Sequence, residues 1–218
     1  MKAIFVEVIK ETAGISSFKL EPETPIKYKP GQWVDVRLMD NGRWTMKHNF
    51  SLSSSPTEDF LQFTTKYRRE SEYKKALWSK RAGDAVEIRG PFGEFVLDTS
   101  DRRPRMFIAG GIGITPFRSM IKYMTDKKLG VLTTLLYSVR NKADAAFARE
   151  LEGPNTIIIE TEKEGRLNAQ KIKSYCPSWR ESTVWLCGPP AMVEAIMEIV
   201  SGMGWLPEAI KSEEFTGY

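Results

Sequence analysis

The chain contains 218 residues, and its 32 Lys and Arg against 28 Asp and Glu give a formal net charge of +4, too small to indicate a nucleic-acid-binding protein by itself. Hydrophobic residues make up 41% of the sequence, enough for a buried core, and no apolar run approaches the roughly 18 residues that a membrane-spanning helix needs. Two cysteines and one histidine are too few for a four-thiolate iron–sulfur or zinc site, and the start of the chain has no cleavable signal, so we expect a cytoplasmic protein without a metal centre or a membrane span.

The first half of the sequence, up to about Thr99, has the pattern of short strands separated by turns. Glycine- and proline-containing turns such as Lys29-Pro30-Gly31 interrupt it, and only Ser71–Lys80 has helical spacing. We expect a small antiparallel β-barrel, because many short strands with regular turns are typical of that fold. The predicted strands are Ala3–Val8, Gly14–Leu20, Gln32–Leu38, Asn49–Ser53, Leu61–Lys66, Ala85–Arg89 and Glu94–Leu97.

From Arg105 onward, strand and helix patterns alternate, which predicts a parallel sheet with helical crossovers. The polar stretch Ser100–Pro104 separates the two halves, so we expect a β-barrel domain at residues 1–99 and an α/β domain at residues 104–218. The predicted strands are Met106–Ala109, Val131–Ser138, Thr156–Thr161 and Thr183–Cys187. The predicted helices are Pro116–Thr125, Ala143–Leu151, Asn168–Tyr175 and Ala191–Ser201.

A glycine-rich turn, Gly110–Pro116, follows the first strand of the second half and reads Gly-Gly-Ile-Gly-Ile-Thr-Pro. Glycines let a backbone approach a phosphate, and the N-terminus of the following helix offers free N–H groups. The dinucleotide fingerprint G-x-G-x-x-G is incomplete, because Pro116 occupies the position of its third glycine. Taken alone, the segment is equally compatible with a phosphate site and with a plain tight turn.

Two further strand ends carry groups that suit a dinucleotide. Residues 185–192 run from a strand through Cys187 and Pro189–Pro190 into a helix, and residues 137–142 place a hydroxyl and two cations at the end of another strand. Ligands of open parallel sheets lie beyond the carboxyl ends of the strands. A buried cysteine and a solvated loop are the ordinary alternatives, but three compatible strand ends favour a dinucleotide site.

One segment of the first half mixes a cation, aromatic groups and hydroxyls. In a strand, His48 and Phe50 point to one side and Asn49 and Ser51 to the other, so the segment could hold a ribityl chain and a pyrophosphate beside an aromatic ring. An edge strand that runs into a serine-rich turn is the simpler alternative. Residues 41–90 contain ten Lys and Arg against six acids, which indicates either a solvated face or an anion site.

Taken in order, four segments resemble the ferredoxin–NADP reductase superfamily of FAD-containing NAD(P)H oxidoreductases. His48–Ser51 looks like the flavin motif Arg-x-Tyr-Ser/Thr of that family, Gly90–Gly93 like the turn after the flavin-barrel strand, Gly110–Pro116 like the nucleotide-binding turn, and Cys187–Pro190 like the Cys-Gly-Pro segment near the nicotinamide. The resemblance covers essentially the whole chain. It implies an N-terminal antiparallel β-barrel that binds FAD and a C-terminal parallel α/β domain that binds the nicotinamide nucleotide.

The resemblance implies how the first half would hold the flavin. Ser51 would hydrogen-bond near flavin N5, Phe50 would lie against the flavin in place of the usual Tyr, and Lys74 stands where the family has Ser or Thr on the pyrophosphate. His48 replaces the arginine of the flavin motif; an imidazole is mostly neutral at pH 7, so a permanent cation is lost, which leaves FMN or weakly held FAD open. The implied flavin-binding residues are His48, Asn49, Phe50, Ser51, Thr65, Lys66, Tyr67, Lys74 and Phe215.

The resemblance also implies residues for the nicotinamide nucleotide and for catalysis. Arg140 and Lys142, with no carboxylate until Asp144, favour the 2′-phosphate of NADPH over NADH. The implied nicotinamide-nucleotide-binding residues are Gly111, Ile112, Gly113, Thr115, Ser138, Arg140, Cys187, Gly188, Pro189 and Met192. The implied catalytic residues are Ser51, Cys187, Glu213 and Tyr218.

The implied function is transfer of hydride from NADPH or NADH to FAD, with electrons passed to a separate acceptor, an acidic ferredoxin-like protein or an oxygenase component. A free-flavin reductase and an electron-transfer subunit of a larger redox complex are alternatives within the same chemistry. A barrel that binds nucleic acid through its basic stretch with Tyr67, Tyr73 and Trp78 is an alternative of another class. It leaves the three strand ends of the second half unexplained, so we expect no nucleic-acid partner.

Overall fold

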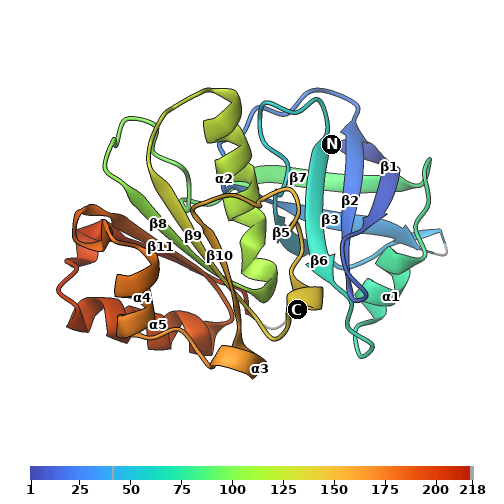
Figure 1. Cartoon of the computed structure of the whole chain (residues 1–218). Coiled ribbons are helices and arrows are strands. Elements are labelled where there is room, and N and C mark those ends of the chain that lie inside the picture. The colour runs from blue at the N-terminus through green and yellow to red at the C-terminus, as the bar shows by residue number, and fades with distance from the viewer. Residues whose placement is uncertain (41, 217–218) are drawn as a thin grey trace.

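The computed structural model describes residues 1–40 and 42–216 and contains two β-sheets that lie side by side (Figure 1). The first half of the chain forms an antiparallel sheet and the second half a parallel one. The fold class predicted from the sequence is therefore confirmed. Within the described residues, no helix is both long enough and apolar enough to cross a membrane.

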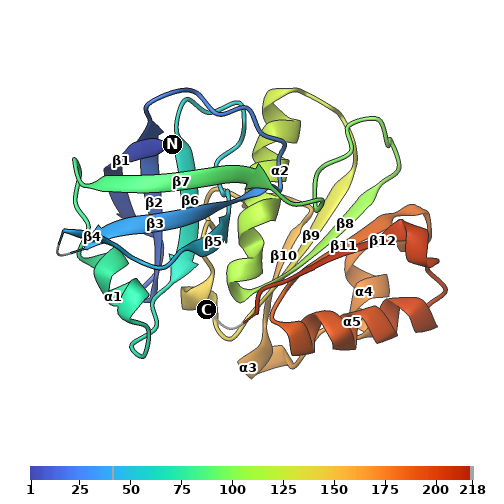
Figure 2. The same ribbon diagram turned by 180° about the vertical axis from the view of Figure 1, so that it is seen from behind.

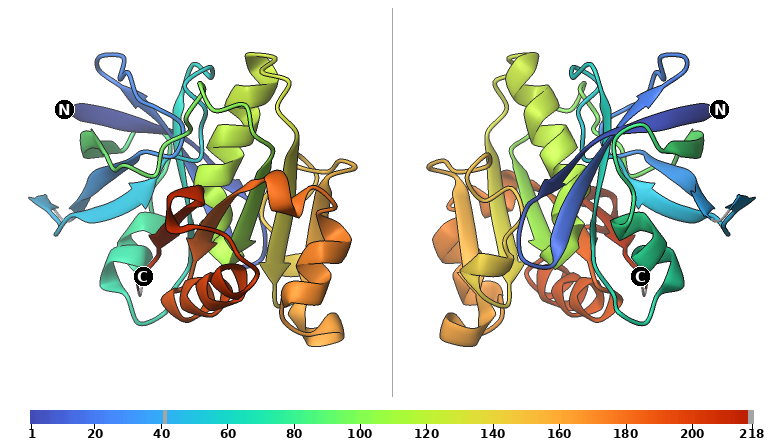
Figure 3. Two further views of the ribbon diagram at one scale, coloured as in Figure 1. Left: turned by 90° about the vertical axis from the view of Figure 1, so that its left-hand side faces the viewer. Right: turned by 90° about the vertical axis from the view of Figure 1, so that its right-hand side faces the viewer.

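The antiparallel sheet curls into a barrel. Its strands follow the order β4-β3-β7-β1-β2-β6, and β5 also pairs with β3. A bridge between Leu52, directly after β5, and Phe63 of β6 brings the two ends of the sheet together. The blue N-terminal strands of this sheet lie on one side of the molecule (Figure 3). The strands are β1 (Lys2–Lys10), β2 (Ile15–Pro22), β3 (Trp33–Asp40), β4 (Arg43–Trp44), β5 (His48–Ser51), β6 (Leu61–Lys66) and β7 (Ala85–Phe92).

Apolar residues with a period of two fill the barrel. In β1, Ala3 and Phe5 are buried while the alternate residues face outward. The rings of Phe18 and Phe63 stack in the core with centroids 5.3 Å apart. Helix α1 (Glu72–Trp78) lies at one end of the barrel (Figure 2) and buries one face against it.

The parallel sheet has the strand order β10-β9-β8-β11-β12 and carries helices on both faces (Figure 2). Helix α2 packs on the face toward the barrel, and α4 and α5 cover the opposite face. The strands are β8 (Arg105–Gly110), β9 (Thr133–Val139), β10 (Thr156–Glu160), β11 (Thr183–Gly188) and β12 (Ile210–Glu214). The helices are α2 (Ile114–Asp126), α3 (Thr161–Glu164), α4 (Ala169–Tyr175) and α5 (Pro190–Gly202).

Two predicted elements are wrong. Glu94–Leu97 is not a strand, because its buried Phe95 and Leu97 pack into the cluster between the barrel and the parallel sheet instead of joining a ladder. Ala143–Leu151 is not an α-helix: a short 3-10 turn is followed by Phe147, whose φ of 59° is left-handed and incompatible with a continuing helix. Conversely, β12 is a strand that the sequence did not predict.

The barrel and the parallel sheet are joined by a buried polar network around Arg118 of α2. Its guanidinium forms ion pairs with Glu58 and Glu150 and donates a hydrogen bond to the carbonyl oxygen of Ser53 at 2.9 Å. Ser119, the next residue, donates to the carbonyl oxygen of Ser54 at 2.5 Å. These contacts hold α2 against the segment that follows β5, so they fix how the two halves meet.

Candidate functional site

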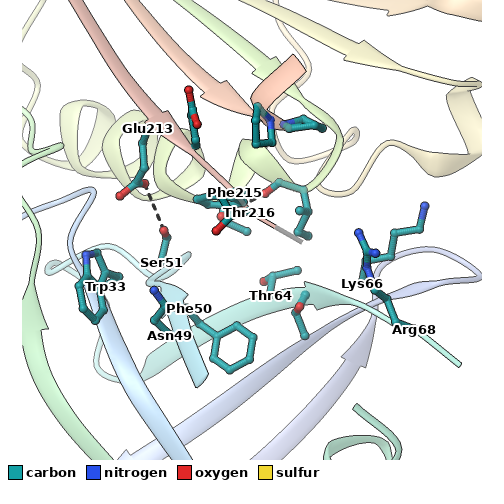
Figure 4. A pocket seen from close by; sticks show the side chains of 16 residues that line it. Trp33, Asn49, Phe50, Ser51, Thr64, Lys66, Arg68, Glu213, Phe215 and Thr216 are labelled. Atoms are coloured by element: carbon teal, nitrogen blue, oxygen red, sulfur yellow. Dashed lines mark hydrogen bonds between the residues drawn. The ribbon is translucent and has the colours of Figure 1, made fainter. Parts of the chain in front are cut away.

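A pocket of about 390 Å³ lies between the two halves (Figure 4). Strands β3, β5 and β6 of the barrel line one side of it, and the turn after β8, the start of α5 and β12 line the other. Its lining residues are Trp33, Asn49, Phe50, Ser51, Thr64, Thr65, Lys66, Arg68, Ile112, Thr115, Pro189, Pro190, Glu213, Glu214, Phe215 and Thr216.

Charges in this pocket are separated by side. Lys66 and Arg68 stand at the barrel end of the pocket, and Glu213 and Glu214 come from β12 on the opposite side (Figure 4). Phe50, on the barrel wall of the pocket, stacks on Phe63 of the barrel core with centroids 4.6 Å apart. The arrangement suits a flat aromatic molecule that carries a negative charge at one end, which is the chemistry of a flavin nucleotide.

The polar pair between Ser51 and Glu213 links the two halves at this pocket. Ser51 Oγ donates a hydrogen bond to Glu213 Oε2 at 3.3 Å, although the two residues are 162 positions apart in sequence. Parallel pairing of β12 with β11 places Glu213 beside Cys187. Burial raises the pKa of Glu213 to about 7, and the Ser51 hydrogen bond opposes part of that rise. The carboxyl can therefore hold or release a proton near neutral pH.

Cys187 is fully buried behind Glu213. Burial, and secondly the charge of Glu213, raise the pKa of its thiol well above the ordinary value. A thiol in that state is a poor nucleophile. This argues against a nucleophilic role for Cys187, and its packing beside the nicotinamide stays a prediction.

Lys74 on α1 is buried directly behind the barrel wall of the pocket. Its Nζ donates to Thr65 Oγ1 at 2.6 Å and lies 4.4 Å from the centroid of the Phe50 ring. Burial, and secondly the charge of Arg68, lower the pKa of Lys74 to about 7. His48 packs on Tyr73, and its pKa is lowered by burial and by Lys74.

The glycine turn after β8 combines close packing with an open backbone. A Cβ on Gly113 would lie 2.2 Å from the carbonyl oxygen of Cys187, so this glycine is required by the approach of two turns. Gly111 has a φ of 53° and nothing within 4 Å of the position of a Cβ, so its backbone faces open space. The turn is therefore compatible with both interpretations of the sequence, a tight turn and a phosphate site. It is tightly packed at Gly113, and its backbone is open at Gly111.

A second hollow of about 280 Å³ adjoins the first and shares Lys66, Ile112 and Pro189 with it. It covers the carboxyl ends of β8, β9 and β10, where a parallel sheet binds ligands. Its lining residues are Thr12, Gly14, Ile15, Lys66, Gly110, Gly111, Ile112, Ser138, Val139, Arg140, Asp144, Thr161, Pro189 and Met192.

Most residues predicted from the sequence gather at these two hollows. Lining the first are Asn49, Phe50, Ser51, Thr65, Lys66, Ile112, Thr115, Pro189, Glu213 and Phe215. Lining the second are Gly111, Ser138, Arg140 and Met192. Directly behind these walls are Lys74, Gly113, Cys187 and Gly188, the last of which accepts a hydrogen bond from the backbone N–H of Phe215.

Three predicted residues stand apart. His48 lies at the end of β5 and packs on Tyr73 instead of appearing among the lining residues, and Tyr67 packs against Trp78 with centroids 5.2 Å apart. Tyr218 lies outside the described residues. Tyr73 is buried, so these aromatics do not form the exposed stacking surface that the nucleic-acid alternative needs.

Sequence reasoning did not name several residues of the first pocket as binding residues: Trp33, Thr64, Arg68, Glu214 and Thr216. The basic stretch contained Arg68 and was the one signal that pointed toward it. Trp33 enters the pocket because β3 pairs with β5, with Trp33 opposite Ser51, and a local pattern does not show such pairing.

Comparison with known proteins agrees with this geometry. Residues 3–97 match the oxidoreductase FAD-binding domain family, and residues 107–156 match the oxidoreductase NAD-binding domain family. Flavohemoprotein A of Dictyostelium discoideum is 30% identical over 95% of this chain, but the chain spans only 58% of that protein's length. The glycine betaine monooxygenase reductase subunit of Pseudomonas aeruginosa is 27% identical over 96% of this chain and 63% of its own length.

Among solved structures, a cytochrome P450 reductase from Amycolatopsis is similar over all of this chain and 70% of its own, with a TM-score of 0.84 and 25% identity. The barrel matches an oxidoreductase FAD-binding domain and the parallel sheet beside it an oxidoreductase NAD-binding domain, so the chain combines the two domain families of a flavin- and nicotinamide-dependent reductase module. Its fold is also that of a ferredoxin–NADP reductase structure, in agreement with the resemblance of its sequence motifs.

Proposed function

We propose that this chain transfers hydride from a nicotinamide nucleotide to FAD and passes the electrons to a separate redox protein. The barrel, residues 1–99, would hold the flavin in the first pocket, and residues 104–218 would hold the nicotinamide nucleotide in the second hollow. The observation that carries the proposal is the position of the Ser51–Glu213 pair, which lies where the barrel and the parallel sheet meet.

The residues of the first pocket fit a flavin by their chemistry. A bound flavin supplies the group that accepts hydride, and the protein supplies binding, orientation and electrostatics. Phe50 offers an aromatic face, while Thr65 and Lys66 offer polar groups along the same wall. Ser51 has a hydroxyl held in place by Glu213, and Glu213 can keep a proton near pH 7. We assign proton holding to Glu213 and positioning to Ser51.

The choice between NADPH and NADH depends on the end of β9 and the start of α3. Arg140, which favoured NADPH in the sequence, forms an ion pair with Glu162 at 2.5 Å. The backbone N–H of Lys142 donates to Glu160 Oε2 at 2.9 Å. Glu162, from α3, thus balances the positive charge of Arg140 that a 2′-phosphate would use, so both nucleotides must be tested.

The separate acceptor is supported by the kinds of protein to which this chain is similar. One is named a reductase subunit of a monooxygenase and another a cytochrome P450 reductase. Lys66 and Arg68 at the edge of the pocket would favour an acidic partner such as a ferredoxin-like protein or an oxygenase component. A free-flavin reductase or a subunit of a larger redox complex would use the same two hollows.

The test is a visible spectrum of the purified protein with FAD added, followed by NADPH or NADH in separate anaerobic samples. Loss of the oxidised flavin band on mixing is the expected result, and the faster nucleotide identifies the preferred donor. Protein that neither binds flavin nor reduces it with either nucleotide would refute the proposal. Retention of flavin through gel filtration separates a resident cofactor from a flavin used as substrate.

A further inference from the structure

Lys74 is a buried cation that has no acid partner. The residue is 1% exposed, and in the part of the chain that the structure describes no carboxylate forms an ion pair with it. Its ammonium carries three hydrogens, of which Thr65 Oγ1 accepts one. A buried charge is unfavourable unless it is paired, so the charged form of Lys74 requires an anion beside it.

The charged and titratable groups near Lys74 increase the need for an anion. Arg68, from the segment after β6, and His48, from β5, both interact unfavourably with its positive charge. Lys75, the next residue of α1, is paired with Glu72 on the same helix, and the hydroxyl of Tyr73 donates to the backbone of β3. Among the described residues of the surrounding elements, no carboxylate is paired with Lys74.

The pocket brings an anion within reach of this lysine. Thr65 and Phe50, the two groups that Lys74 contacts, both line the first pocket, so Nζ lies one layer behind its wall. The acids of the pocket stand on the opposite side with β12, and the barrel side carries Lys66 and Arg68 (Figure 4). A flavin nucleotide would therefore place its phosphate at the end of the pocket with Lys66 and Arg68 and its ring toward Ser51.

We propose that Lys74 is the principal cation for the flavin phosphate in this protein, acting with Thr65, and that it takes up a proton when the phosphate binds. This inference rests on the proposed flavin site and assigns one role within it. In the ligand-free protein burial lowers the pKa of Lys74 to about 7, so its amine can lose a proton near neutral pH. A phosphate beside Nζ favours the charged form and raises that pKa.

The sign of the pH dependence follows from that linkage. Below pH 7 Lys74 is already charged, so the affinity for FAD is at its highest. As the pH rises above 7, binding must capture a proton, and the dissociation constant for FAD rises by up to about tenfold per pH unit until the pKa of the bound form is reached. FAD suits this series better than FMN, because the phosphate monoester of FMN titrates near pH 6 itself.

The experiment compares three flavins on flavin-free protein by fluorescence titration: FAD, FMN and riboflavin, which has no phosphate. At pH 6.5, Lys74→Met is expected to raise the dissociation constants of FAD and FMN by at least about tenfold and that of riboflavin by less than about twofold. The reason is that only the phosphate-containing flavins would lose a charge-assisted hydrogen bond from Lys74. It is also expected to abolish the rise of the FAD dissociation constant above pH 7. Lys75→Met, on the same helix and paired with Glu72, is the matched control and is expected to behave as wild type.

The outcomes separate the two proposals. Wild-type protein that binds no flavin refutes the proposed function. The role of Lys74 is overturned if wild-type protein binds FAD and Lys74→Met leaves that affinity unchanged. It is also overturned if the variant loses as much affinity for riboflavin as for FAD. Lys74→Gln retains a donor for Thr65 and serves if the methionine variant does not fold; phosphate-specific loss in that variant supports the same conclusion.

Discussion

Glu213 is half-buried where the two halves meet, and we expect Glu213→Gln to stabilise the ligand-free protein more at pH 8 than at pH 4.5. Burial raises the pKa of this carboxyl from 4.5 to about 7. Between those values the folded chain holds a proton that the unfolded chain has released. The contribution of this carboxyl to the free energy of unfolding is therefore most favourable below pH 4.5. It falls as the pH rises and reaches its lowest value above pH 7.

The size of the effect follows from the two pKa values. Their difference corresponds to about 3 kcal/mol at pH 8, which is an upper limit because the side chain is only partly shielded from solvent. Glu213→Gln keeps the shape and can still accept from Ser51, but it has no proton to lose. Its free energy of unfolding, relative to wild type, is expected to be about 1–3 kcal/mol higher at pH 8 than at pH 4.5.

Urea unfolding of the flavin-free protein at pH 4.5, 6, 7 and 8 measures this difference. The exposed neighbour Glu214→Gln serves as the control and is expected to change stability equally at every pH. Parallel stability curves for wild type and Glu213→Gln would refute the assignment of a raised pKa to this carboxyl, and with it the proton-holding role proposed for the site.

Three further substitutions test the geometry around the two hollows. Gly113→Ala places a methyl group 2.2 Å from the carbonyl oxygen of Cys187 and is expected to destabilise the fold by about 3 kcal/mol in urea unfolding, with loss of nicotinamide-nucleotide binding; unchanged stability would contradict the close approach of the two turns. Arg118→Met leaves Glu58 without its buried partner and is expected to cost about 3 kcal/mol, which a shift of the urea midpoint would show. Glu162→Gln removes the carboxylate paired at the end of β9 and is expected to lower KM for NADPH about threefold while KM for NADH stays constant; equal changes for both nucleotides would argue against a role in discrimination.

Local patterns in the sequence were sufficient for most of the barrel and for the turns of the parallel sheet. Alternation in β1 and the glycine turn after β8 depend on neighbouring residues, so they can be read along the chain. The predicted helix at 143–151 failed because Phe147 adopts a left-handed backbone although its neighbours have helical spacing. Glu94–Leu97 failed because its apolar residues serve the contact between the two halves.

The strand β12 shows why the candidate site was only partly predictable. Its sequence, Ile-Lys-Ser-Glu-Glu, has one apolar residue, and it joins the sheet as an edge strand through β11. No local signal distinguishes such a segment from a polar loop, so Glu213 was reached only through the family resemblance. Trp33 and Arg68 enter the pocket through pairing and turns that no local pattern encodes.

A series of contacts through both halves of the structure fixes the positions of Ser51 and Glu213 relative to each other. Two residues beyond Ser51, the carbonyl oxygen of Ser53 accepts a hydrogen bond from Arg118 of α2. Helix α2 begins at the glycine turn, where the backbone of Gly113 lies against Cys187.

The same series of contacts returns to the site through the parallel sheet, because Cys187 is in register with Glu213 in the pairing of β11 and β12. Each step is a hydrogen bond or a close backbone contact, so the distance between the hydroxyl and the carboxyl depends on structure on both sides of the interface. Loosening the Arg118 network should therefore change the pKa of Glu213 as well as stability, since the raised pKa depends on burial between the two halves. Weakening of the pH dependence of unfolding in Arg118→Met would show that the interface, beyond joining two domains, sets the proton affinity of the site.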